Sequence, residues 1–293
     1  MLAVVAFTPP EHHPMSRKLV LAATALMAAS IAPIAWAADA KPSTPTESST
    51  PASATPAPLP PRRKASPEER AAAERLAPIS RAAFWARETD IDPTDVVAGV
   101  RLAVSLRAIG QYDDAASAAQ RVLVIDPNNF EALMEIARAH VAEGLGFYAI
   151  DPAQRAQALA PKDWRPLSVL GIAYAQVRRG DDAEAAWKAA LALSPNNPAV
   201  LSNLAMSRLS KGDAAGAETL LRRAVAQPSA GLQERQDLTL VLGVQGKLDE
   251  AEILLRRDLP PDQADANLAY LKAISTGKDI APAPSNPAKG AGS

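Results

Sequence analysis

Residues 164–197 read WRPLSVLGIAYAQVRRGDDAEAAWKAALALSPNN, and this stretch decides the fold. Ala183 places a small side chain in the second half of the stretch, which allows a helix there to lie close against a helix in the first half. Ser194-Pro195-Asn196-Asn197 then ends the stretch, because proline and asparagine favour a break between helices. The stretch predicts a helix, a short turn and a second helix.

The same features recur along the chain every 34 residues. Turn glycines, small alanines and unit-ending prolines form three series in one register. Their members are Gly110, Gly144, Gly212 and Gly246, with Arg178 in the missing place; Ala115, Ala149, Ala183, Ala217 and Ala251; and Pro127, Pro161 and Pro195. Glycine permits the tight turn that follows the first helix of each unit. Because one helix pair cannot bury its apolar face alone, we expect the pairs to stack into a superhelix.

The period and its packing residues resemble the tetratricopeptide repeat. The third unit matches that pattern best, through Leu170, Gly171, Tyr174, Ala183, Trp187, Ala190 and Pro195. The resemblance implies an all-α fold, a right-handed superhelix of about five helix pairs that begin near Val96, Phe130, Trp164, Pro198 and Leu232. Flanking helices are expected from Ser66-Pro67 to about Arg87 and from Asp262 to about Ser275, which gives a solenoid over residues 67–275.

Two units depart from the pattern. Pro152 falls inside the expected second helix of the second unit, so we expect that helix to start late, with Asp151 as its cap and Pro152 as its first residue. In the fifth unit, Asp258 replaces a core alanine and Pro260-Pro261 ends the helix early. Terminal repeats often deviate in this way because they cap the stack.

The composition excludes several classes of function. The 293 residues carry a formal net charge of −1, so a basic surface for nucleic acid is not expected. The chain contains no cysteine. This excludes disulfides, cysteine-bound zinc, thiol catalysis and a lipid anchor carried on cysteine.

Residues 15–37 have the layout of a secretory signal peptide. A basic pair precedes an apolar run, and Ala35-Trp36-Ala37 supplies the small residues that a signal peptidase requires. We therefore expect residues 1–37 to be a cleaved signal peptide, cut near Ala37, with translation starting at Met15. The mature chain is expected in the periplasm, and the alternative is an uncleaved inner-membrane anchor.

Two segments are expected to lack a core of their own. Residues 38–66 are rich in proline, serine, threonine and alanine, and such a composition cannot bury enough apolar surface to offset its ordering entropy. We expect a disordered linker there and a disordered tail over residues 276–293.

The sequence offers no catalytic set. It contains no phosphate-binding loop, zinc motif or nucleophile elbow. His140, the one histidine of the repeat region, stands where these repeats usually carry a core tyrosine, and we expect it to be packed and hydrogen-bonded. Carboxylate pairs such as Asp113-Asp114 precede the second helices, where acidic groups favour the helix dipole. We therefore expect no enzymatic activity, no cofactor and no metal site.

The resemblance to tetratricopeptide repeats implies a groove for a protein partner, because the first helices of that family line the concave surface. The corresponding residues are Val100, Arg101, Val104, Met134, Arg138, Ser168, Ile172, Asn203, Met206, Gln236 and Leu240. Methionine and small or amide side chains suit an adaptable peptide site. The basic clamp with which some relatives hold a C-terminal carboxylate is not reproduced, since Val100 and Val104 occupy two of its positions.

Two stretches resemble the TadD family of tight-adherence (Flp-type) pilus assembly proteins, and the resemblance extends over about residues 68–275. The stretches are Arg256-Arg257-Asp258-Leu259-Pro260-Pro261 followed by Asn267-Leu268-Ala269-Tyr270-Leu271, and Ala83-Phe84-Trp85 through Asp92-Pro93-Thr94-Asp95. The resemblance implies an exported accessory protein that helps an outer-membrane secretin to assemble or localise.

Many members of that family are lipoproteins anchored through a cysteine, which this chain lacks. We therefore expect a periplasmic adaptor without a lipid anchor, which binds a secretin or another pilus component and no nucleic acid. The sequence leaves two alternatives open. One is a general scaffold for cell-envelope assembly, and the other is an enzyme or enzyme subunit that uses the repeats as a docking arm.

Overall fold

A computed structural model describes residues 63–276. The predicted signal peptide lies outside the described residues, and so do the predicted linker except residues 63–66 and the predicted tail except Thr276, which ends α14. Between residues 63 and 276 the chain consists of helices and their connections. The helices are α2 (Pro67–Ala73), α3 (Pro78–Ile91), α4 (Val96–Ala108), α5 (Tyr112–Ile125), α6 (Phe130–Glu143), α7 (Gly146–Leu159), α8 (Trp164–Gln176), α9 (Gly180–Leu193), α10 (Pro198–Ser210), α11 (Ala214–Val225), α12 (Leu232–Val244), α13 (Leu248–Asp258) and α14 (Pro261–Thr276).

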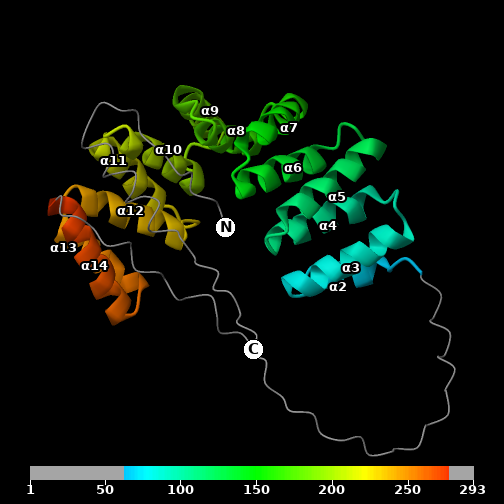
Figure 1. The fold of residues 1–293 in the computed structure, drawn as a ribbon, viewed down its shortest axis with the longest axis horizontal. Coiled ribbons are helices and arrows are strands. Elements are labelled where there is room, and N and C mark those ends of the chain that lie inside the picture. The colour runs from blue at the N-terminus through cyan, green and yellow to red at the C-terminus, as the bar shows by residue number, and fades with distance from the viewer. Residues whose placement is uncertain (1–62, 277–293) are drawn as a thin grey trace, which may run out of the picture.

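Each helix from α3 to α14 packs against the next one along the chain. Figure 1 shows the result as an arc, in which α4, α6, α8, α10 and α12 follow the inner side and α5, α7, α9, α11 and α13 the outer side. The inner helices are the ones that begin at the predicted unit starts. The predicted fold class, an all-α superhelix of stacked helix pairs, is confirmed.

The turns inside the units require left-handed backbone. Gly110, Gly144, Gly212 and Gly246 have φ angles of 84°, 89°, 88° and 74°. These values favour glycine because a side chain there meets its own backbone. Arg178 adopts the same conformation with φ 62°, and it is the residue that replaces glycine in the 34-residue series.

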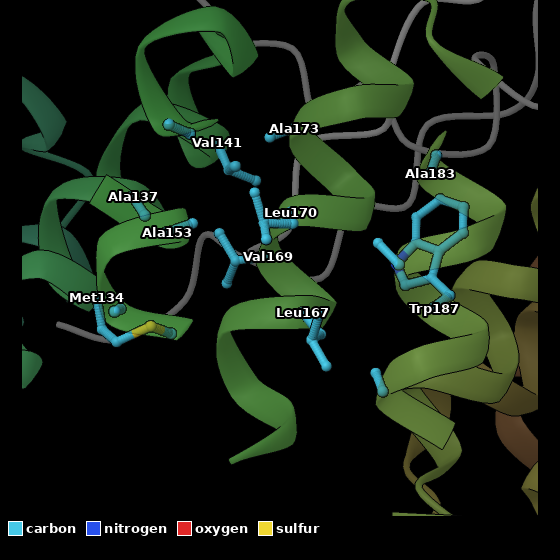
Figure 2. Packing of buried hydrophobic residues seen from close by; sticks show 14 of the residues in the cluster. Met134, Ala137, Val141, Ala153, Leu167, Val169, Leu170, Ala173, Ala183 and Trp187 are labelled. Carbon is cyan, nitrogen blue, oxygen red and sulfur yellow. The ribbon is translucent and has the colours of Figure 1, made fainter. Parts of the chain in front are cut away.

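Small residues allow the helices of a pair to approach closely. The five alanines of the second series are all fully buried. In the third pair, Figure 2 shows Ala183 and Trp187 of α9 facing α8 beside Leu167 and Leu170. The Trp187 indole lies directly on Gly171: a Cβ added at Gly171 would be 2.2 Å from the Nε1 atom of Trp187. The indole N–H donates a hydrogen bond to the carbonyl of Ser168 at 3.3 Å.

The first expected helix is in fact two helices. The sequence predicted one helix from Ser66-Pro67 to about Arg87, but α2 ends at Ala73 and α3 begins at Pro78. Pro78 explains the break, because proline lacks an N–H and forces the residue before it into an extended conformation. Ala77 accordingly has ψ 148°.

The prediction for Pro152 was wrong. α7 begins at Gly146, in register with the other second helices, and Pro152 lies inside it. Pro152 is buried together with Ala149 and Ala153. Burial of this face between α6 and α8 therefore outweighs the helical hydrogen bond that proline cannot make.

The C-terminal end follows the prediction closely. α13 ends at Asp258, and α14 starts at Pro261, one residue before the predicted start. Asp258 does not leave a defect in the core, because its carboxylate accepts a hydrogen bond from Arg235 of α12 at 2.8 Å. Leu271 of α14 lies against Gly243 of α12, so α14 covers the last inner helix.

The N-terminal end is fixed to the solenoid by a buried carboxylate. Glu88 of α3 is 1% exposed and accepts hydrogen bonds from the Ala65 amide and from Arg70. Arg70 also donates to Asp95, the cap of α4, at 2.6 Å. These contacts define the point at which the preceding segment joins the repeats.

Candidate functional site

The inner helices form the surface on which the predicted binding residues lie. α4 contacts α6, α6 contacts α8, and α10 contacts α12, so neighbouring first helices pack side by side as well as against their own partners. This packing decides which side chains remain accessible, because a residue that faces the neighbouring first helix is covered.

Eight of the eleven predicted groove residues are partly or fully exposed. They are Val100, Arg101, Val104, Arg138, Ile172, Asn203, Met206 and Gln236. They lie on all five inner helices. The accessible part of the predicted site therefore extends along the inner side of the arc shown in Figure 1.

The other three predicted residues are buried and cannot contact a partner in this structure. Met134 is fully buried in the core between α6 and its neighbours, where Figure 2 shows it. Ser168 is buried beside Trp187, and the indole N–H of Trp187 donates a hydrogen bond to the Ser168 carbonyl. Leu240 is buried because α14 lies against α12 and adds Leu268 and Leu271 to the same cluster. These three assignments are corrected to core positions.

The N-terminal half of the surface carries an ion network that the sequence did not predict. Glu135 of α6 is 1% exposed and accepts hydrogen bonds from Arg107 of α4 at 2.7 Å and from Arg138 at 2.6 Å. Arg165 of α8 donates to Glu131 of α6 at 3.2 Å. The sequence contains one signal of this network, since Glu131, Glu135 and Arg138 stand four and three residues apart and therefore share one face of their helix.

The C-terminal half of the inner surface presents apolar and amide side chains, whereas the N-terminal half carries the network around Glu135. Met206 and Asn203 of α10 and Gln236 of α12 are partly exposed, which gives apolar and amide groups. Next to them Asp237 is buried and accepts hydrogen bonds from the hydroxyl of Ser202 and from the Gln233 amide. Burial raises the pKa of Asp237, and the nearby carboxylate of Glu234 acts in the same direction.

His140 differs in part from its prediction. It is packed, partly buried and in contact with the Tyr148 ring, at 5.8 Å between ring centroids. However, its buried Nδ1 atom makes no hydrogen bond within the described residues. Burial lowers the pKa of His140, which favours the neutral imidazole.

The described part of the chain also bears on two other kinds of site, a metal centre and a membrane span. Between residues 63 and 276, no group of three or more histidine or acidic side chains is arranged to hold a metal ion. In the same range, no helix combines the length and the apolar character needed to span a bilayer.

The adjacent residues Arg222 and Arg223 of α11 both make contacts within the fold. Arg222 donates to Glu218 at 2.8 Å and to Glu250 at 2.6 Å, while Arg223 donates to Asn196 and to the carbonyl of Pro195. These arginines therefore join neighbouring helix pairs on the outer side.

The repeats are of a known class. The family model described as tetratricopeptide repeat matches residues 100–163 and 169–231. These two ranges therefore carry tetratricopeptide repeats, as the sequence pattern predicted. Solenoids of stacked repeats present an extended surface, which such proteins commonly use to bind protein partners.

Solved structures share the fold. A tetratricopeptide-repeat protein of Thermus thermophilus is 25% identical, with a TM-score of 0.53 over 60% of this chain and 98% of that one. A repeat protein of Parabacteroides merdae is 14% identical, with a TM-score of 0.55 over 72% and 84%. A chain of the APC/C hetero-tetramer Cut9–Hcn1 is 17% identical, with a TM-score of 0.54 over 71% and 48%. No curated protein matches the chain.

Proposed function

We propose that this chain is a non-catalytic adaptor of the bacterial cell envelope, which holds a segment of a protein partner against its inner helices. The observation that carries the proposal is the row of accessible side chains of mixed chemistry along those helices. Ile172 and Met206 supply apolar contacts, and Asn203 and Gln236 supply amides that can pair with the backbone of an extended segment. Methionine adapts its shape to different partners.

The resemblance to the TadD family supports a place in tight-adherence pilus assembly. We propose that the partner is a secretin or another component of the pilus machine. The residues that carry the resemblance have structural roles at the end of the solenoid, where Asp258 pairs with Arg235 and Pro261 starts α14. The resemblance therefore concerns how the array is capped, and the partner itself must be identified by experiment.

The proposed location is the periplasm, on the strength of the signal-peptide pattern over residues 15–37. N-terminal mapping of the chain purified from the envelope fraction tests this step. A mature N-terminus at Ala38 supports export with cleavage, whereas recovery of an intact residue 15–37 segment would favour the membrane anchor instead.

A crosslinked pull-down from the native envelope, read by mass spectrometry, tests the adaptor function. The groove variant combines Ile172→Glu and Met206→Glu, because both side chains are accessible and lie on inner helices. The matched control is Val124→Glu on the outer helix α5, where the side chain is 83% exposed. Met134 is left unchanged, since a charge at that buried position would unfold the repeat.

The two halves of the proposal give separate outcomes. Recovery of a secretin or pilus component with the parent and the Val124 control, and its loss with the groove variant, supports both the pilus partner and the groove. Recovery of other envelope proteins in the same pattern refutes the pilus role and favours a general envelope scaffold. Equal recovery with all three chains would show that the inner surface is not the binding site.

A further inference from the structure

A buried carboxylate on α12 lacks a positive partner. Asp237 is 8% exposed and accepts hydrogen bonds from two neutral donors, the hydroxyl of Ser202 on α10 and the Nε2 atom of Gln233 at 2.9 Å. Among the ion pairs of residues 63–276, none includes Asp237. Arg235, its neighbour on the helix, is turned to Asp258 at 2.8 Å.

The repeat supplies an internal comparison for this group. Glu135 of α6 stands three 34-residue periods before Asp237 and is also buried. Glu135 is neutralised by Arg107 and Arg138. The residues at the corresponding positions around Asp237 are Leu209 and Leu240, both of which are buried. The buried carboxylate therefore has two cationic partners within the chain in the second unit, where it is Glu135, and neither of these partners in the fifth unit, where it is Asp237.

A buried carboxylate without a cation is costly, because two neutral hydrogen bonds replace only part of its lost hydration. One of these bonds is easily given up. Gln233 lies in the first turn of α12, is exposed, and can swing into solvent. Its departure would free the Oδ1 atom of Asp237 for a stronger, charge-assisted hydrogen bond.

We propose that Asp237 anchors a lysine or arginine side chain of the protein segment bound against α10 and α12. The ligand cation takes the place of the Gln233 amide and plays the part that Arg107 and Arg138 play for Glu135. Asn203, Met206 and Gln236 lie on the same two helices. The segment recognised here therefore combines one basic residue with an apolar side chain that packs on Met206, while the two amides pair with its backbone. This inference rests on the proposed binding function and specifies the chemistry of its partner.

Peptide selection on the mature chain tests the inference without knowledge of the natural partner. Displayed random dodecapeptides are selected in parallel on the parent, on Asp237→Asn, and on the groove variant Ile172→Glu with Met206→Glu. Asp237→Asn keeps the shape of the side chain and removes its charge. One acceptor oxygen becomes an NH2 donor, which the Ser202 hydroxyl can accept, while the remaining oxygen can still accept from Gln233. Circular dichroism and a melting curve confirm that each variant is folded.

We expect peptides from the parent to share one lysine or arginine, and peptides from Asp237→Asn to lose that preference while keeping the apolar one. A consensus peptide then gives a double-mutant cycle by fluorescence anisotropy. Replacing its basic residue by glutamine should weaken binding to the parent about tenfold or more, as for a hydrogen bond between charged groups. The same replacement should change binding to Asp237→Asn less than about threefold.

The outcomes separate this inference from the function on which it rests. If the parent selects peptides without a basic residue, and the groove variant loses them, the anchor is refuted and the groove stands. An unchanged basic preference with Asp237→Asn would also refute the anchor. If the parent selects no peptide at all, both proposals are overturned.

Discussion

Replacing Gly171 by alanine is expected to lower the free energy of unfolding, because no space is left for a methyl group there. An alanine Cβ there would lie 2.2 Å from Nε1 of Trp187 and 2.5 Å from both Cδ1 and Cε2. Ordinary carbon contacts are about 3.5–4.0 Å, so the indole would have to move by more than about 1 Å. Trp187 is buried and its N–H is bound to the Ser168 carbonyl, so the ring has little room to do so.

The magnitude follows from these contacts. Overpacking of a rigid core costs up to about 3 kcal/mol, and loss of the indole hydrogen bond costs about 1 kcal/mol. The better helix propensity of alanine returns about 1 kcal/mol. We therefore expect Gly171→Ala to destabilise the solenoid by about 3 kcal/mol, which for a domain of this size lowers the Tm by roughly 6–12 °C.

Thermal melting followed by circular dichroism at 222 nm measures this effect, and amide hydrogen exchange in α8 and α9 shows whether it is local. Gly180→Ala is the matched control, because its Cβ would meet nothing closer than Lys211 Cε at 3.9 Å. The control should melt at or above the parent temperature. A Gly171→Ala protein that melts with the control would refute the close packing of the indole on the glycine.

The remaining predictions concern other parts of the solenoid. Arg178→Gly should raise the stability in urea by up to about 1 kcal/mol, because glycine relieves left-handed strain at φ 62°; a loss of stability would show that the arginine side chain matters more than its backbone. The ammonium of Lys247 and the guanidinium of Arg222 hold the pKa of Glu218 at about 2, below its ordinary value of 4.5, so its stabilising contribution is complete above pH 4.5 and is lost as the pH falls toward 2. The Tm of the parent should therefore fall more steeply over this range than that of Glu218→Gln, and parallel curves would contradict the ion pairs. Glu88→Gln should release residues 63–66 and increase trypsin cleavage after Lys64, with the exposed Glu68→Gln as control and equal cleavage rates as the contrary result.

The sequence was sufficient for the architecture because the period constrains the backbone strongly. Each inner helix begins at the residue where its unit was predicted to start, from Val96 to Leu232. The two local errors both involve proline. Pro78 divides a helix that was predicted to be continuous, and Pro152 does not delay the start of α7. The local preferences of proline do not show which apolar surface each residue buries, and that burial decides the case of Pro152.

The predicted groove was less accurate for a different reason. A repeat pattern shows which residues lie on the first helix, but it does not show which neighbouring helix covers them. Met134 is covered because α6 has a first helix on either side, and Leu240 because α14 packs on α12. The charge network around Glu135 was missed because Arg107 lies on another unit, 28 residues away, and because the spacing of Glu135 and Arg138 on α6 does not show that the carboxylate is buried.

A comparison of equivalent positions in different repeats indicates which buried charge is available to a partner. Stacking requires only the small and apolar residues of the period, so a charged residue at a buried inner position must be explained by a contact. Glu135 has that contact inside the chain, through two arginines. Asp237 has two neutral donors and two leucines at the corresponding places. Both residues lie on first helices at the same place of the 34-residue period, and a partner's cation is the contact that would make the two positions alike.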